Sequence, residues 1–166
     1  SSSLSFTSSV LTSTYDSYVI KFLNIHPASD SQNMRFNLST DNGSNYNVNK
    51  VQCHFRAYHD EAGSGQAIAY DSGLSSQGDT GYLDFTQSIS SDSDHSFSGF
   101  MNLFRPSSTT FVKHYNFHVI RNNSANYVGD DYTSGYGNTT TAVNNIDFKF
   151  ASGNIESGIM KLYGVA

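Results

Sequence analysis

Apolar and polar residues alternate one by one along most of this chain. Met34, Phe36 and Leu38 are separated by polar side chains, and the same two-residue period returns in three further segments. The apolar members of those segments are Val51, Cys53, Phe55 and Ala57; Leu83, Phe85 and Ile89; and Ile146, Phe148 and Phe150. Successive side chains of a strand point to opposite faces, so this period predicts half-buried β-strands. No segment shows the period of an amphipathic helix.

The strand candidates cover most of the chain and are separated by residues that favour turns. Asn, Asp and Gly tolerate positive φ and favour antiparallel hairpins, as in the segment 41–44. Short strands joined in this way predict an all-β fold, an antiparallel jelly-roll-like β-sandwich. The candidates lie at about 18–25, 34–39, 51–58, 66–70, 82–89, 97–104, 111–120, 145–150 and 158–165.

The length of 166 residues suits one domain. Residues 15–166 are predicted to form a single sandwich, and the Ser/Thr-rich residues 1–14 an N-terminal arm or edge strand that reaches a neighbouring subunit. The first four residues contain neither an initiator Met nor an apolar signal region. We therefore expect a chain that has been trimmed, or one that begins downstream of the start of its gene.

Composition excludes several classes of partner. Charged residues make up 14% of the chain and the net charge is -5. A nucleic-acid binder needs a clustered basic face, so no nucleic-acid partner is predicted. No apolar run approaches the ~18 residues of a membrane-spanning helix, so no membrane partner is predicted either. The lone Cys53 excludes an internal disulfide and lies at an apolar position of its strand, which predicts a buried, unreactive thiol.

The chain contains no motif that would carry catalysis or hold a cofactor. There is no G-x-S-x-G elbow, no P-loop and no dinucleotide fingerprint, so we predict neither an enzyme nor a cofactor. The segment Ser91–His95 could bind Ca²⁺ through its two aspartates, but the spaced carboxylates of a calcium loop are missing and a solvated turn is predicted. His114 and His118 share one face of a strand, while His54 lies on the polar face of another. Imidazoles so placed can hold a metal, but a wet polar face gives the same spacing, and no metal site is predicted.

Three strand candidates are apolar on both of their faces. In the segment 97–104, Phe97, Met101 and Leu103 form one face, yet Phe100 and Phe104 point the other way. Strands of this kind are buried on both sides, which a two-layer sandwich alone does not provide. We therefore predict subunit or partner contacts on the second face; a covering loop or the N-terminal arm is the alternative. The residues expected at this interface are Phe100, Phe104, Met160, Leu162, Val19 and Leu23.

A polar stretch from Asn122 to Thr141, rich in Gly, Asn and Thr, is predicted to be a long loop, and loops of that length are usually functional. Tyr127, Tyr132 and Tyr136 punctuate it. Aromatic rings stack on sugars while Asn and Asp supply directional hydrogen bonds, so one hypothesis is that the three tyrosines contact a glycan. The other is that they pack onto the sandwich or against a neighbouring subunit.

Three blocks of residues follow one another in a fixed order. They are Phe22–Asp30 with Phe36–Tyr46; Leu103–Lys113; and Gly135–Asn138, Ala142–Val143, Ile146–Phe150, Ser152–Gly158 and Lys161–Gly164. Across roughly residues 18–165, their order and spacing resemble structural, head- or tail-associated virion proteins of tailed phages, especially marine and cyanobacterial phages. The resemblance implies a place in the virion, which is assembled in the host cytoplasm, and it brings no catalytic residues.

Together these observations predict a non-enzymatic virion structural protein, a capsid decoration or tail-associated component. Its expected partners are further copies of itself, with a trimer suggested by likeness to other virion jelly rolls, and other virion proteins. The alternative is a carbohydrate-binding module that recognises host surface glycan through residues 122–141.

Overall fold

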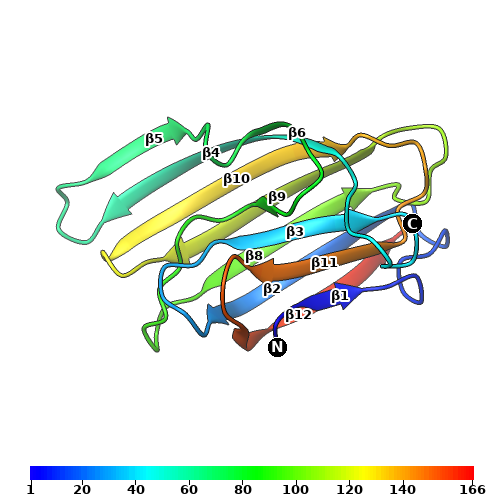
Figure 1. Cartoon of the computed structure of the whole chain (residues 1–166). Helices are drawn as coiled ribbons and strands as arrows, with labels where there is room; N and C mark the ends of the chain where they lie inside the picture. Colours follow the sequence, from blue (N-terminus) through cyan, green and yellow to red (C-terminus); the bar gives the residue numbers. More distant parts are fainter.

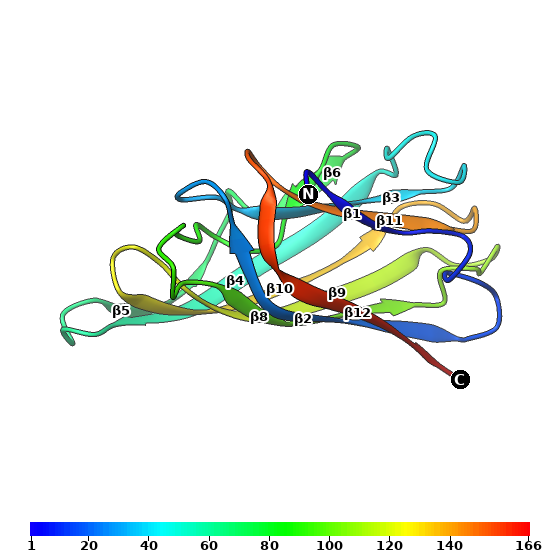
Figure 2. The ribbon, with the colours of Figure 1, turned by 90° about the horizontal axis from the view of Figure 1, so that it is seen from below.

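The computed structural model describes residues 1–166 and shows two antiparallel β-sheets packed face to face (Figures 1 and 2). The smaller sheet has the order β1-β11-β3-β7. The larger sheet has the order β12-β2-β8-β9-β10-β4-β5, and β6 pairs with β4. The strands are β1 (Leu4–Phe6), β2 (Ser17–Pro27), β3 (Met34–Ser39), β4 (Lys50–Asp60), β5 (Gln66–Tyr70), β6 (Ser76–Asp79), β7 (Leu83–Asp84), β8 (Phe97–Phe104), β9 (Lys113–Asn122), β10 (Tyr127–Gly137), β11 (Asn145–Phe150) and β12 (Ile155–Val165).

The prediction of an all-β antiparallel sandwich is confirmed, while the jelly-roll connectivity stays a prediction. The predicted strands at 34–39, 66–70, 97–104 and 145–150 coincide with β3, β5, β8 and β11. Within the predicted strand 82–89, only β7 and an isolated bridge between Gln32 and Ile89 form. The N-terminal arm contains an edge strand, because β1 pairs with β11 of its own chain.

The core is an aromatic layer between the two sheets. Phe85 and Phe117 stack with ring centroids 4.2 Å apart, and Phe36 packs against Phe117 at 4.9 Å. Phe22 from β2 meets Phe148 from β11 edge to face at 5.4 Å. All five rings are almost completely buried. The side of each sheet that turns toward this layer is called the inner face below, and the opposite side the outer face.

The larger sheet extends beyond the smaller one at β4, β5 and β10 (Figure 1). There a long segment, residues 71–96, crosses its inner face. Gln52 donates through Nε2 to the carbonyl oxygens of Leu74 and Asp84, at 2.7 and 2.8 Å. The backbone N–H of Gln87 donates to Asp131 at 3.3 Å. A polar cover therefore takes the place of an apolar sheet over this end of the molecule.

This cover reverses the predicted orientation of β4. Gln52 and His54 are buried, whereas Cys53 is exposed and Phe55 is 45% exposed, so the prediction of a buried Cys53 and an outward His54 is wrong. Polar side chains face inward because they find hydrogen-bond partners there. At the start of the strand, Lys50 donates to Asn37 Oδ1 at 2.6 Å and to the Val48 carbonyl at 2.8 Å. Burial lowers the pKa of Lys50 to about 8.

The predicted loop at 122–141 is wrong in most of its length, because β10 runs through it as a central strand between β9 and β4. Its glycines suggested a loop, but two of them make room for side chains of neighbouring strands. A Cβ on Gly135 would lie 2.7 Å from the Tyr115 hydroxyl, and one on Gly129 would lie 2.9 Å from the Arg121 guanidinium. Glycine in a strand often marks such a close approach.

Candidate functional site

Aromatic side chains run across the outer face of the larger sheet in a continuous row. Strand register places Phe100 of β8 beside His118 of β9, His118 beside Tyr132 of β10, and Tyr132 beside Phe55 of β4. His118 and Tyr132 stack at a centroid distance of 4.2 Å, and Tyr132 and Phe55 stack at 5.0 Å with parallel planes. Phe100 meets His118 edge to face at 5.7 Å. These four residues are called the aromatic row.

Exposed apolar side chains surround the aromatic row on the same face. On β5, Tyr70 lies opposite Phe55 and is 66% exposed, while Ile68 is 84% exposed. Soluble monomers rarely leave large contiguous apolar patches in water, and such patches mark interaction surfaces. Further exposed apolar side chains on this face belong to Leu23, Phe104, Ile120, Val128, Ile159, Tyr163 and Val165.

Most of the residues predicted at the interface lie on this outer face. Phe100, Phe104 and Leu23 are 37%, 42% and 39% exposed, and Val19 is half-buried. The prediction for Met160 and Leu162 is wrong, since both pack against the core from the inner face of β12. The outward side of β12 carries Ile159, Tyr163 and Val165 instead. The sequence alone could not show which side of β12 faces the core, because both the odd-numbered and the even-numbered residues of this strand include apolar side chains.

The three tyrosines of the predicted glycan loop do not form one group. Tyr132 and Tyr136 occupy even positions of β10 and lie on the outer face, whereas Tyr127 lies on the inner face. Tyr132 has both ring faces covered, by His118 on one side and Phe55 on the other. A sugar would need an open ring face for stacking, so Tyr132 cannot serve as a sugar platform. Tyr136 is free of such stacking and meets His114 edge to face at 6.2 Å.

The polar groups of the aromatic row share one hydrogen-bond partner, Asp130. His118 and Asp130 are 2.6 Å apart between Nε2 and Oδ1, and the Tyr132 hydroxyl donates to the other oxygen of Asp130 at 3.2 Å. Desolvation, with Asp130 beside the hydroxyl, raises the pKa of Tyr132. The row therefore presents aromatic edges and little net charge.

A buried polar cluster lies behind the aromatic row, on the inner face. Arg121 donates through Nε to Asp131 Oδ2 at 2.7 Å, and both side chains are almost completely buried. His54 shares a hydrogen bond of 2.8 Å with the Thr133 hydroxyl, and its Nε2 lies 3.9 Å from Asp131 Oδ1. Burial lowers the pKa of His54, so the neutral ring is favoured. Sequence reasoning missed this cluster, because its residues come from three strands and share no motif.

The other histidines and acidic residues do not converge. His95 donates its backbone N–H to the Asp92 carbonyl at 2.9 Å, so the segment Ser91–His95 forms a turn. The side chains of Asp92 and Asp94 point largely into solvent. His114 and His118 have separate partners, Tyr136 and Asp130. No three His, Cys, Asp or Glu side chains meet in an arrangement that could hold a metal ion.

A shallow groove of about 760 Å³ opens on the outer face beside the aromatic row. Aromatic side chains of Tyr70 and Tyr136 contribute to its lining, and Asn116, Ser134 and Gln77 add polar groups. A groove with this lining matches the chemistry of a sugar more closely than the row itself does.

No protein-family model matches the sequence, and no curated protein matches it significantly. None of its elements is a helix long and apolar enough to cross a membrane.

Proposed function

We propose that this chain is a non-enzymatic structural component of a phage virion, and that it assembles with further copies of itself through the outer face of the larger sheet. The observation that carries the proposal is the exposed aromatic row. Its rings stack on each other and present their edges, an arrangement suited to packing against another protein surface. The virion setting rests on the three ordered sequence blocks, whose resemblance is to tailed-phage structural proteins.

The dimensions of the outer face suit a stable interface between copies. The seven strands on the main path of the sheet, from β12 to β5, are spaced ~4.8 Å apart. With a length of about eight residues at ~3.4 Å each, they give a flat area of about 800 Å². A standard interface buries about 800 Å² on each partner. Because the row carries little net charge, two copies can approach without strong repulsion. Repetition on a particle would then turn modest pairwise affinity into avidity.

The oligomeric state of the purified chain tests the proposal. Light scattering should give a mass above that of the 18.2 kDa chain, and Phe100→Asp should reduce it toward the monomer. Phe55→Thr is a milder second variant that keeps a good strand-forming residue. Phe111→Asp is the matched control, because Phe111 is 62% exposed but lies between β8 and β9, outside the sheet. A wild-type monomer at all concentrations, or equal effects of Phe100→Asp and Phe111→Asp, would contradict the proposal.

A second candidate is glycan recognition in the groove between Tyr70 and Tyr136. The groove's two tyrosine rings and its polar side chains favour this candidate, and Tyr136 contributes from strand β10 rather than from a loop. Tyr136→Ala should then abolish retention on host polysaccharide while leaving the oligomeric mass unchanged. Retention that Tyr136→Ala does not alter would reject this candidate.

A further inference from the structure

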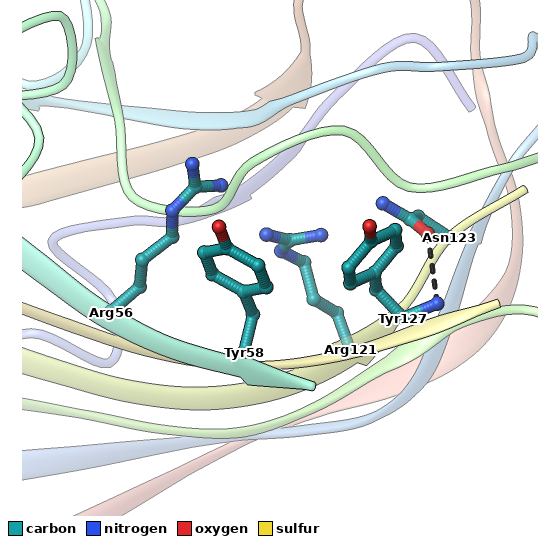
Figure 3. Close-up of a pocket in the computed structure, with 5 residues that line it drawn as sticks. All are labelled: Arg56, Tyr58, Arg121, Asn123 and Tyr127. Atoms are coloured by element: carbon teal, nitrogen blue, oxygen red, sulfur yellow. Dashed lines mark hydrogen bonds between the residues drawn. The ribbon is translucent and has the colours of Figure 1, made fainter. Parts of the chain in front are cut away.

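A cavity of about 230 Å³ lies on the inner face of the larger sheet, beyond the edge of the smaller sheet. Five side chains line it: two arginines and two tyrosines point in the same direction, and Asn123 lies beside Tyr127 (Figure 3). They alternate along the cavity in the order Arg56, Tyr58, Arg121, Tyr127 and Asn123. This cavity is on the opposite side of the sheet from the aromatic row, so an inference about it does not rest on the proposed assembly.

Glycine at position 129 places one of the two arginines in the cavity. Gly129 of β10 pairs with Tyr58 of β4 on one side and with Arg121 of β9 on the other. Because Gly129 has no Cβ, the Arg121 guanidinium can lie over its backbone. Asp131 accepts from Nε of this guanidinium, and the Ser88 carbonyl accepts from Nη1 at 3.2 Å. The charge of Arg121 is thus largely compensated.

Arg56 is the unpaired cation of the cavity. Its side chain is half-buried and forms no ion pair, and its Nε is fully buried without a hydrogen-bond partner. Its guanidinium carbon lies 5.2 Å from the centre of the Tyr58 ring, which holds the side chain toward the cavity. Asp60 and Asp71 accept hydrogen bonds from the neutral side chains of Ser64 and Gln87, and neither forms an ion pair with Arg56. With Arg121 paired to Asp131, Arg56 is the one guanidinium of the cavity that has no carboxylate partner.

The other free polar groups of the cavity can all donate hydrogen bonds. Asn123 Oδ1 already accepts from the backbone N–H groups of Ala125 and Tyr127, at 3.1 and 3.2 Å. The amide nitrogen of Asn123 is therefore the end left free. The hydroxyls of Tyr58 and Tyr127 point the same way as the guanidinium groups. Donors arranged around one unpaired guanidinium form a site for a single negative charge.

We propose that this cavity binds a small organic acid through its carboxylate. The guanidinium of Arg56 would hold the two carboxylate oxygens in a fork, with hydrogen bonds from the Tyr58 and Tyr127 hydroxyls and from Asn123 Nδ2. One unpaired guanidinium favours a monoanion over phosphate, which is partly a dianion at neutral pH. The volume lies below the ~300–1,000 Å³ of sites for drug-sized ligands, so the ligand is of monosaccharide size or smaller.

Titration of the full chain with sodium glucuronate, followed by amide NMR, tests the proposal. Glucose serves as the neutral probe and inorganic phosphate as the competing anion. Glucuronate should give saturable shifts at residues around the cavity, and glucose and phosphate should not. Because the protein has a net charge of -5, general attraction of anions to its surface is disfavoured.

The variants assign binding to the cavity. Arg56→Gln should weaken glucuronate binding by about tenfold or more, since a charged hydrogen-bond donor is lost. Tyr58→Phe changes no charge and keeps the ring, and it should weaken binding severalfold even if Arg56→Gln proves unstable. Lys161→Gln, which removes a charge on the exposed strand β12, should change nothing. The proposal is overturned if glucuronate gives no saturable shifts, if phosphate binds equally well, or if Lys161→Gln weakens binding as much as Arg56→Gln.

Discussion

At the scale of single residues, Arg121 of β9 and Asp131 of β10 form an ion pair that is removed from water. Removing one partner of a buried pair leaves an uncompensated charge. We expect Asp131→Asn to lower the free energy of unfolding by about 3–5 kcal/mol. Asp16→Asn is the control, because Asp16 pairs with Arg105 at 3.5 Å on the surface and its loss should cost less than about 0.5 kcal/mol. Urea unfolding curves measure both, and equal losses would show that the buried pair has no special role.

His54 makes stability depend on pH. Its pKa in the folded chain is below the unfolded value of 6.5, because burial disfavours the imidazolium. Well above pH 6.5 the His54 ring is neutral in both the folded and the unfolded chain, so its titration does not change the free energy of unfolding. As the pH falls below 6.5, His54 binds a proton in the unfolded chain but stays neutral in the folded chain. The free energy of unfolding therefore decreases. Urea midpoints of the wild type and His54→Gln at neutral and mildly acidic pH measure this, and an equal decrease in both proteins would exclude His54 as a cause.

At the scale of strands, the two faces of the larger sheet carry apolar residues for different reasons. Phe117 of β9 is 1% exposed within the core, and Phe55 of β4 is 45% exposed on the outer face. We expect Phe117→Ala to cost about 3–5 kcal/mol of stability. Phe55→Ala should cost less than about 1 kcal/mol in the dissociated chain, since it leaves no cavity. Chemical denaturation at low protein concentration measures both, and a cost for Phe55→Ala as large as that for Phe117→Ala would place Phe55 in the fold rather than at an interface.

The sequence was sufficient to predict those strands whose apolar face meets the core. The alternation of β3 and β11 predicted both their bounds and their buried sides. Strand β4 was predicted with its faces reversed, because Gln52 and His54 are buried against a covering segment whose position no local pattern shows. Strand β10 was missed because Gly129 and Gly135 are common in loops, and the side chains that need their space belong to other strands. The aromatic row required the same knowledge of register. Of its four members, Phe100 was predicted at an interface and Tyr132 in a loop that contacts a glycan or packs against protein, while Phe55 and His118 were not predicted at an interface.

At the scale of the whole molecule, the sandwich separates two kinds of surface. The outer face of the larger sheet is broad, apolar and nearly neutral, whereas the cavity on its inner face is small and polar and contains one unpaired guanidinium. Assembly through the outer face would leave the cavity accessible on each copy, because the two lie on opposite sides of one sheet. A particle built from such copies would display a repeated set of sites that bind carboxylate ligands.

The reactivity of Cys53 tests the central claim of assembly through the outer face most directly. This thiol is exposed on the outer side of β4, beside Ser134, and it is the only cysteine in the chain. Maleimide labelling of the wild type should slow as protein concentration rises and copies cover the face. Phe100→Asp should label rapidly at every concentration. Wild-type labelling that stays fast under conditions where light scattering shows an oligomer would contradict the account, because the copies would then meet through another surface.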